Sequence, residues 1–431
     1  MEYFEPEIEC ASPEKLREIQ SERLKTMIEN CYSNVPFYKE KLDEAGIKPE
    51  DIKSIDDIVK LPFTTKQDLR DTYPFGLIAV PHDDLIRIHA SSGTTGKQTV
   101  VAYTQNDVDT WSACAARSIV GVGGKKSDFV QVSYGYGLFT GGLGLHYGAE
   151  LLGSTVIPAS SGNTARQVQI LEDYGSDIIC CTPSYALFIG ETIKEKGIDA
   201  KDLKLRAGIF GAEPWTEEMR KEIEKSLAIK AYDIYGLSEI AGPGVAYECQ
   251  CQNGMHINED YFYPEIINPE TGEPVPDGED GELLFTCIGK EALPLIRYRT
   301  RDIASITHEK CECGRTLVRM SKPKGRTDDM LIIRGINVFP SQIESVLLEL
   351  GMNPNYRMII DRKNNLDTLE VQIEMDENMF SDTVKSIEGT ERKIANALQS
   401  TLNIAAKIRL LEPKSIQRSE GKAQRVFDNR H

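Results

Sequence analysis

The chain has 431 residues, of which 40% are hydrophobic and 27% charged, and its formal net charge is −17. This length predicts two or three domains, and the acidic balance argues against a nucleic-acid partner and against docking on an anionic membrane. Ten cysteines in so long a chain favour free thiols or a metal site over a disulfide scaffold. No apolar run approaches the roughly 20 residues of a membrane span, and the acidic N-terminus does not resemble a signal peptide, so we expect a cytoplasmic protein.

The first 71 residues are predicted to be rich in helix, because Leu16, Ile19, Leu24 and Met27 recur at helical spacing. From about residue 85 to 233, short β-rich runs alternate with longer helical ones. The expected strands are 127–132, 155–158, 177–181 and 205–210, with helices at 163–174 and 216–226. This alternation predicts an α/β fold with a largely parallel sheet flanked by helices, whose ligands lie at the carboxyl ends of the strands.

A different pattern follows in the last part of the chain. Residues 246–320 are predicted to form a β-rich part, with turns at Asn268–Gly272 and Pro276–Gly278. Strands at 369–375 and 407–411 and an amphipathic helix at 381–402 then indicate a small α+β domain. We therefore predict a large domain over residues 1–326 and a small domain over residues 327–431, joined by a polar hinge.

A segment rich in glycine and hydroxyl groups, H-A-S-S-G-T-T-G-K, begins at His89. Glycines let backbone N–H groups approach an oxyanion, and hydroxyls and an ammonium group add donors, so the segment predicts a phosphate-binding loop. Only two residues separate its glycines, whereas the P-loop of kinases and GTPases has four. From this segment alone, a polar surface loop is the alternative. The expected phosphate contacts are Ser91, Ser92, Gly93, Thr94, Thr95, Gly96 and Lys97.

Two clusters of cysteine and histidine predict a metal site. The first contains Cys249, Cys251 and His256, and the second contains His308, Cys311 and Cys313. Thiolate and imidazole ligands on two glycine-containing loops suit tetrahedral Zn²⁺. Neither cluster has the usual C-x-x-C spacing, so six unconnected residues near the surface are the alternative.

Further motifs follow the glycine-rich segment in a fixed order: G-A-E-P from Gly211, Y-G-L-S-E from Tyr235, Y-R-T-R-D from Tyr298, R-T-D-D-M from Arg326 and E-G-K from Glu420. Together they resemble the adenylate-forming superfamily of acyl-CoA synthetases, adenylation domains and luciferases. Within it, Tyr134–Gly144 and Arg334–Glu344 resemble the phenylacetate-CoA ligase family. The resemblance runs from about Leu61 to Val426. It implies an ATP-dependent ligase that adenylates an aryl or arylacetic acid and transfers the acyl group to CoA, releasing AMP and pyrophosphate.

The resemblance also implies which residues act on the nucleotide. Lys422 is expected to stabilise the transition state of adenylation, Lys66 to close over the phosphates and Glu239 to bind Mg²⁺. Without the resemblance, Lys422 would be a solvated surface lysine. Asp302 is expected to accept the ribose hydroxyls, with an Arg301–Asp302 surface pair as the alternative. The full set of expected ATP or AMP contacts beyond the phosphate loop is Gly211, Ala212, Glu213, Pro214, Asp233, Ile234, Tyr235, Gly236, Ser238, Asp302 and Arg326.

The acyl pocket and the CoA site follow from the same resemblance. The acyl pocket is expected to contain Tyr134, Tyr136, Phe139, Gly141 and Gly142, because aromatic walls and adjacent glycines leave room for a ring. An ordinary core cluster of aromatic residues is the alternative. The small domain is expected to rotate between the two half-reactions, with Asp328 as the hinge and with Arg334 and Gly335 beside CoA.

For the metal site, the resemblance favours Cys249, His256, Cys311 and Cys313, which would close the coordination sphere and make the zinc structural. Cys251 and His308 remain alternative ligands. A homodimer is implied by the family. Two other functions stay open at this point: adenylation with transfer to another acceptor, such as a carrier protein, and nucleotide or CoA binding without catalysis.

Overall fold

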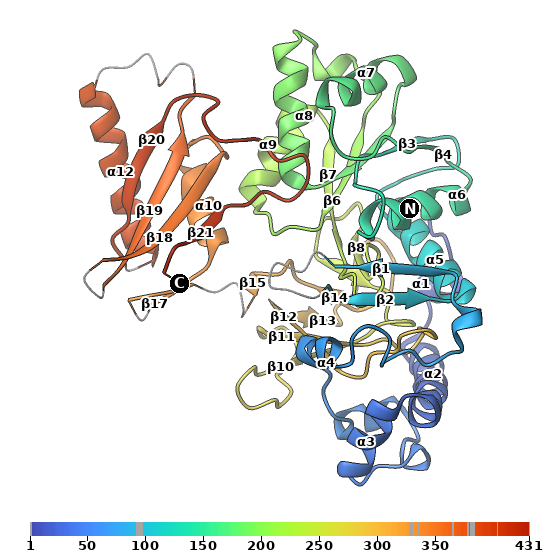
Figure 1. The fold of residues 1–431 in the computed structure, drawn as a ribbon. Coiled ribbons are helices and arrows are strands. Elements are labelled where there is room, and N and C mark those ends of the chain that lie inside the picture. Colours follow the sequence, from blue (N-terminus) through green and yellow to red (C-terminus); the bar gives the residue numbers. More distant parts are fainter. Residues whose placement is uncertain are drawn as a thin grey trace.

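The structure is a computed structural model that describes residues 2–91, 98–326, 331–334, 336–363, 366–376, 379, 384–402 and 404–430. A large body extends to about residue 326 and a smaller body follows it, with the two lying side by side (Figure 1). None of the helices in these ranges combines the length and the apolar character that crossing a membrane requires.

Helices dominate the first 71 residues, as predicted: α1 Pro6–Glu9, α2 Pro13–Asn34, α3 Pro36–Glu44, η1 Pro49–Asp51, η2 Ile55–Lys60 and α4 Lys66–Asp71. Pro13 starts α2, where a missing N–H costs no hydrogen bond, and Ser12 Oγ accepts the Lys15 N–H at 3.3 Å. Leu24 and Ile28, one helical turn apart, are fully buried. The cap and the apolar stripe together account for this helix.

A nine-stranded sheet forms the centre of the large body, with strand order β13-β14-β9-β8-β7-β6-β5-β3-β4. Its parallel part consists of β3 Phe129–Val132, β4 Thr155–Ile157, β5 Ile178–Cys181, β6 Ala207–Gly211 and β7 Lys230–Tyr235. The surrounding helices are α5 Gln105–Gly121, α6 Gly141–Leu152, α7 Thr164–Tyr174, α8 Pro183–Glu195 and α9 Glu217–Leu227, with η3 His82–Asp84 and η4 Ala200–Asp202 in loops. The predicted α/β fold is confirmed.

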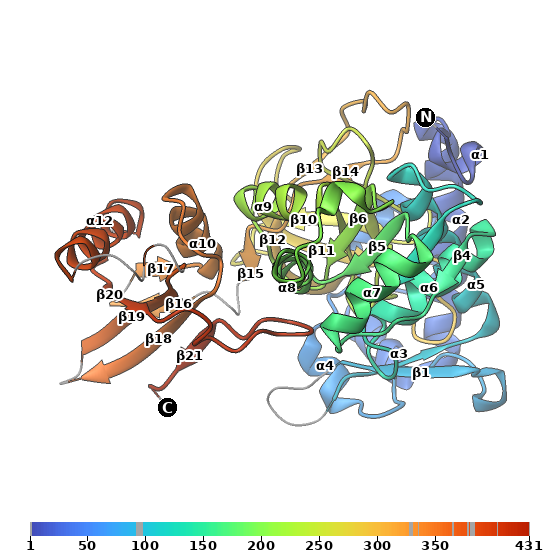
Figure 2. The same ribbon diagram turned by 90° about the horizontal axis from the view of Figure 1, so that it is seen from above.

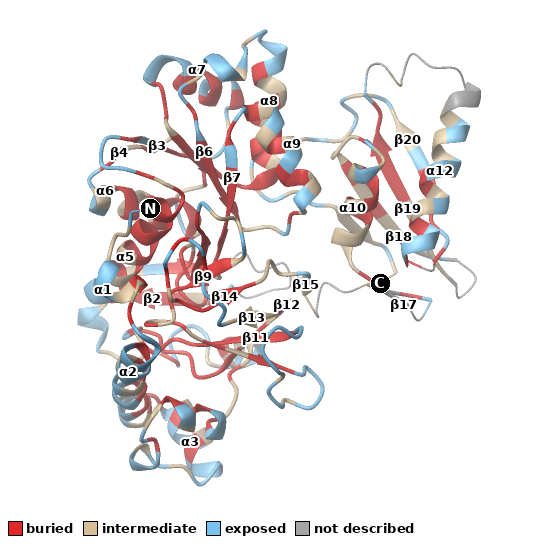
Figure 3. Cartoon of the chain, turned by 180° about the vertical axis from the view of Figure 1, so that it is seen from behind, coloured by how far each residue is buried: buried red, intermediate tan, exposed pale blue. Residues whose placement is uncertain are grey.

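Both faces of the parallel strands are covered, which explains their continuous apolar sequence. In β5, Ile178 and Cys180 belong to the apolar cluster that includes residues of α5 and α6. The alternate residues Ile179 and Cys181 belong to the cluster that includes residues of α7, α8 and α9. All four are fully buried, and the centre of the sheet is correspondingly red in Figure 3.

The strands of the β-rich stretch are shared between two sheets. Antiparallel extensions of the central sheet are β8 Ala246–Glu248, β9 Met255–Ile257, β13 Ile306–Thr307 and β14 Arg319–Met320. A separate four-stranded sheet contains β10 Tyr263–Ile267, β11 Gly281–Thr286, β12 Tyr298–Ala304 and β15 Gly325–Arg326. A two-stranded antiparallel sheet, β1 Arg87–Ala90 and β2 Val100–Tyr103, flanks the glycine-rich segment.

The small body has its own sheet and its own core. Its strands β18 Tyr356–Lys363, β19 Leu366–Glu374, β20 Lys407–Leu411 and β21 Val426–Asp428 follow the order β20-β19-β18-β21. Helices α10 Pro340–Glu349 and α12 Val384–Leu402 accompany them, and β16 Leu331–Ile333 pairs with β17 Ile336–Val338. Buried residues such as Ile360, Val371 and Leu398 form one apolar cluster. This is the predicted α+β arrangement.

Candidate active site and metal centre

The lysine loop, residues 419–423, extends from the small body to the large one (Figure 2). Directly before Lys422, the carbonyl oxygen of Gly421 accepts hydrogen bonds from Thr182 Oγ1 at 2.9 Å and from Ser184 Oγ at 3.1 Å. Thr182 follows the last residue of β5, and Ser184 lies in the first turn of α8. The loop is therefore held at the carboxyl edge of the parallel strands, where ligands of α/β folds bind, and Lys422 is exposed there.

The turn after β6 meets the other side of the lysine loop. A Cβ on Gly211 would lie 2.2 Å from the carbonyl oxygen of Ile234, so only glycine fits at the end of this strand. Two residues later, Glu213 accepts the Ser184 N–H at 2.6 Å and the Ala423 N–H at 3.1 Å. Desolvation raises the pKa of this carboxyl. The predicted nucleotide turn and the predicted lysine loop are thus in direct contact.

Strand β7 ends next to β6 and adds the second predicted nucleotide segment. Because β6 and β7 are parallel and pair through Gly211 and Ile234, their carboxyl ends lie together. The predicted residues that gather at this edge are Gly211, Ala212, Glu213, Pro214, Asp233, Ile234, Tyr235, Gly236 and Ser238.

Asp302 lies in a buried polar contact, not in a surface pair. The Tyr235 hydroxyl donates to Asp302 Oδ2 at 2.6 Å, and Arg326 Nη1, from the neighbouring strand, lies 3.7 Å from Asp302 Oδ1. Burial raises the pKa of Tyr235 well above its usual value, which keeps the hydroxyl a donor. Arg301 instead lies 3.9 Å from Glu282. Three residues from separate motifs thus meet at one point.

The loop after β7 brings Glu239 to Lys66. A Cβ on Gly236 would lie 1.7 Å from a carbonyl oxygen of the same loop, so the chain can turn here only at glycine. Ser238 Oγ then lies 3.3 Å from Thr140 Oγ1. Glu239 is 5% exposed, and Lys66 Nζ lies 3.6 Å from its Oε1. A buried carboxylate of this kind can supply one of the few protein oxygens that Mg²⁺ takes when phosphates provide the others.

Lys290 is a neighbour of this loop that the motifs did not predict. Its side chain is buried, its Nζ donates to the carbonyl oxygen of Ile240 at 2.8 Å, and it lies 4.5 Å from the centroid of the Tyr103 ring. Burial lowers its pKa, while the negative charges of Asp107 and Glu239 act in the opposite direction. Nothing in the sequence around this lysine distinguishes it from an exposed one.

Asp233 lies within a network of protein side chains. Burial raises its pKa to about 6, and Lys322 Nζ lies 3.6 Å from its Oδ2. The same ammonium lies 3.9 Å from the centroid of the Trp215 ring. Asp233, which the resemblance predicts to contact the nucleotide, is therefore also paired with a side chain of the protein. Lys322 is a second residue that the motifs did not predict.

The predicted acyl residues surround the start of α6. Tyr134 is buried, and its ring centroid lies 6.4 Å from that of Phe139. A Cβ on Gly141 would lie 2.5 Å from the Phe139 ring, and one on Gly142 would lie 2.8 Å from a backbone oxygen. A side chain at either position would therefore collide with the protein's own groups, which explains why both positions are glycine. Tyr136 is half-buried, and its hydroxyl lies 3.2 Å from a ring nitrogen of His146.

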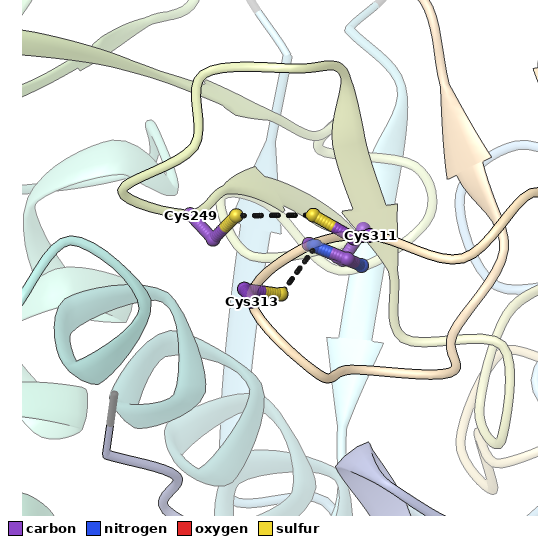
Figure 4. A group of neighbouring side chains, drawn as sticks. Cys249, Cys311 and Cys313 are labelled. Atoms are coloured by element: carbon purple, nitrogen blue, oxygen red, sulfur yellow. Dashed lines mark hydrogen bonds between the residues drawn. The ribbon is translucent and has the colours of Figure 1, made fainter.

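Cys249, Cys311 and Cys313 lie together (Figure 4), and His256 completes the group of four favoured metal ligands. Their ligand atoms all lie within 4.8 Å of one another. Cys249 Sγ lies 3.7 Å from Cys311 Sγ, and Cys313 Sγ lies 3.4 Å from His256 Nε2. Ligands about 2.3 Å from a shared centre at tetrahedral angles lie about 3.7 Å apart, so the cluster has the dimensions of a zinc site.

The environment of the cluster favours metal binding. His256 Nδ1 donates to the carbonyl oxygen of Leu317 at 3.3 Å, which leaves Nε2 as the ligand atom. Hydrogen bonds from Cys249 and His256 lower the pKa of the Cys313 thiol, whereas the hydrogen bond to Cys313 raises that of Cys249 and burial raises that of Cys311, so one thiolate is shared within the cluster. Of the alternative ligands, Cys251 lies beside the cluster, whereas the exposed His308 pairs with a carboxylate elsewhere.

Several predicted residues lie outside the described part of the chain: Ser92, Gly93, Thr94, Thr95, Gly96, Lys97, Asp328 and Gly335. Ser91, which precedes them, donates its N–H to the Thr99 carbonyl oxygen at 3.0 Å. Arg334 is exposed in the turn after β16, and its Nε donates to the Asp367 carbonyl oxygen at 2.7 Å.

Comparison with known proteins places this geometry in context. The AMP-binding enzyme family matches residues 16–288, and the AMP-binding enzyme C-terminal domain matches residues 335–430. The chain is 51% identical to a phenylacetate-coenzyme A ligase of Escherichia coli (strain K12), over 98% of this chain and 97% of the relative.

Two crystal structures of a 2-hydroxyisobutyryl-CoA ligase, each 29% identical, cover 99% of this chain and 92% of their own. The structure in the postadenylation state with 2-HIB-AMP gives a TM-score of 0.93. The structure in the thioesterification state, with 2-HIB-AMP and CoA, gives 0.73. The two bodies of the present chain are therefore arranged more like those of the postadenylation state.

Proposed function

Since the chain belongs to the phenylacetate-CoA ligase family of AMP-binding enzymes, we propose that it converts an aryl or arylacetic acid to its CoA thioester in two steps. The first step joins the carboxylate to the α-phosphate of ATP and releases pyrophosphate. The second transfers the acyl group to the thiol of CoA and releases AMP. The observation that carries the proposal is the position of the lysine loop on Thr182, Ser184 and Glu213, at the carboxyl edge of the parallel strands.

In the adenylation step the enzyme must bring two anions together and stabilise the charge that develops between them. Lys422 supplies the cation at the attacking carboxylate and the α-phosphate, and Lys66 supplies another at the phosphates. Glu239 would hold Mg²⁺, which neutralises phosphate charge when bound. Asp302, oriented by Tyr235 and Arg326, accepts the ribose hydroxyls.

The second step needs no nucleophile from the protein, because the thiol of CoA attacks the acyl adenylate. The small body rotates about Asp328, removes Lys422 and brings Arg334 and Gly335 to CoA. The polar contacts between the bodies, such as those of Gly421, support this rotation because water can replace them at low cost.

The acid is identified by an assay across a panel. Pyrophosphate and AMP formation are measured with phenylacetate, benzoate, indoleacetate, acetate and palmitate, each with and without CoA. We expect kcat/KM for the aryl acids to exceed that for acetate by at least about 30-fold, because burying a ring contributes about 2–3 kcal/mol. Palmitate should also be a poor substrate, because a short, wide slot excludes a long chain sterically. Acetate or palmitate as the best substrate would contradict the aryl specificity. If AMP formation does not require CoA and yields no CoA thioester, then CoA is not the acyl acceptor.

The Cys249, His256, Cys311 and Cys313 cluster is proposed to bind one structural Zn²⁺ per chain. Its ligand spacing and burial support this, and a bound zinc would crosslink the loop after β8 to the loop before β14. A cytoplasmic location, expected from the sequence, and a homodimer, implied by the family resemblance, remain predictions for cell fractionation and for sedimentation analysis.

A further inference from the structure

Glu213 connects the two bodies with a single carboxylate. Its Oε1 accepts the Ser184 N–H of the large body at 2.6 Å, and its Oε2 accepts the Ala423 N–H of the small body at 3.1 Å. Ala423, whose N–H is the donor from the small body, directly follows Lys422. A hydrogen bond this close to the lysine constrains the backbone that aims its side chain.

The small body also brings a cation toward Glu213. Arg425, whose side chain is 16% exposed, forms an ion pair with Glu344 and lies 4.6 Å from the centroid of the Tyr356 ring. The positive charge of Arg425 lowers the pKa of Glu213, against the larger effect of desolvation, which raises it. Docking of the small body thus supplies this carboxylate with both a donor and a counter-charge.

From these contacts we propose that Glu213 is a positioning residue for adenylation, which docks the lysine loop and acts through Lys422 and not on the reacting atoms. This rests on the proposed function, in which Lys422 acts in the first step and leaves before the second. A residue that only binds the nucleotide would act in both steps, since ATP and the acyl adenylate share the adenosine group. Glu213 should act in adenylation alone.

The test measures the two half-reactions separately in Glu213→Ala, Glu213→Gln and wild type. Adenylation is followed as phenylacetate-dependent pyrophosphate release at saturating ATP, and thioester formation is followed from supplied phenylacetyl adenylate and CoA. We expect Glu213→Ala to lower the adenylation rate about 10- to 100-fold, because small misplacement of a catalytic group has effects of this size. Glu213→Gln should lie between Ala and wild type, because an amide retains one acceptor oxygen. Thioester formation should change less than 2-fold.

The control is Glu222→Gln, which changes a partly exposed carboxylate on α9 that pairs with Lys225, and neither rate should change. Thr182→Val/Ser184→Ala removes the two side-chain donors to Gly421 but keeps the Ser184 N–H. This double variant should also lower the adenylation rate and leave thioester formation unchanged, and it can be measured even if Glu213→Ala does not fold.

An equal fall in both half-reactions, or a rise in the KM for ATP with an unchanged adenylation rate, would overturn the positioning role. Wild-type protein that forms no acyl adenylate from any acid in the panel would instead overturn the proposed function.

Discussion

The docked lysine loop and the cysteine cluster differ in how they are held. The lysine loop contacts the large body through polar groups, and the ion pairs beside it are partly exposed, with side-chain exposures of 66% for Lys414 and 54% for Glu195. The ligands of the cysteine cluster are at most 7% exposed, and all four belong to the large body. One contact lies between two bodies, and the other fastens two loops of the same body.

This difference indicates which of the two contacts can break and re-form in each catalytic cycle. Exposed ion pairs contribute about 0–1 kcal/mol each, since water replaces them readily. Bonds from thiolates to a structural metal contribute far more and also fix the loops that provide them. Substitutions in the lysine loop should therefore change individual steps of the reaction, whereas substitutions in the cluster should change the stability of the whole large body.

The largest expected effect is that of Lys422→Ala, which would separate the two half-reactions most strongly. Without its ammonium, the charge that develops during adenylation loses a direct stabilising group, and we expect the adenylation rate to fall by about 10²–10³. Thioester formation from supplied acyl adenylate should persist, because in the proposed rotation the lysine leaves the site before CoA attacks. Stopped assays of each half-reaction measure this. An equal loss in both would contradict rotation of the small body.

Cys313→Ser tests whether the cysteine cluster binds a metal that stabilises the large body. We expect the purified wild type to contain about one zinc per chain and the variant to lose it, with the free energy of unfolding lowered by more than about 3 kcal/mol. Metal analysis and denaturant unfolding measure these two quantities.

Cys251→Ser is the matched control, because this thiol lies next to the cluster without being one of its four ligands. It should retain zinc and lower the stability by less than about 1 kcal/mol. Metal-free wild-type protein of undiminished stability would show that the cluster is a set of free thiols.

The sequence predicted the fold well because alternation of apolar runs is a local signal. Strand β5 was expected at 177–181 and lies at Ile178–Cys181, and the strand and helix types along the parallel sheet agree. The division of the β-rich stretch between two sheets was not predicted. Which strand pairs with β7 depends on long-range register, such as Ile234 opposite Tyr247, and short strands carry little information about their partners.

The site was predicted where a motif carries its own chemistry. Thiol and imidazole groups are typical metal ligands, the resemblance selected four of the six candidates, and the structure brings those four together. Lys290, Lys322 and the contact between Glu213 and Ala423 were missed. A lysine or a glutamate looks the same in sequence whether it is solvated or buried against a backbone group, so only the fold reveals these roles.

The smallest expected effect concerns the ion pairs that flank the lysine loop. Glu191, on α8, accepts hydrogen bonds from two groups of the small body, Arg418 Nε at 2.9 Å and Asn355 Nδ2 at 3.0 Å. Glu191→Gln should weaken docking by roughly 0.5–1 kcal/mol and lower the adenylation rate about 2- to 5-fold, with thioester formation unchanged.

Glu195→Gln is the control for Glu191→Gln. It removes the charge of a more exposed ion pair between the two bodies, since Glu195 and its partner Lys414 are both more than half exposed. Its effect should stay below about 2-fold, since solvent screens an exposed pair more strongly than a half-buried one. Raising the salt concentration to about 0.5 M should reduce the difference between Glu191→Gln and wild type, because screening weakens the same ion pair in the wild type. If the two variants have equal effects, or if salt leaves the difference intact, then charge does not contribute to docking, and the backbone hydrogen bonds of Gly421 and Ala423 alone hold the lysine loop.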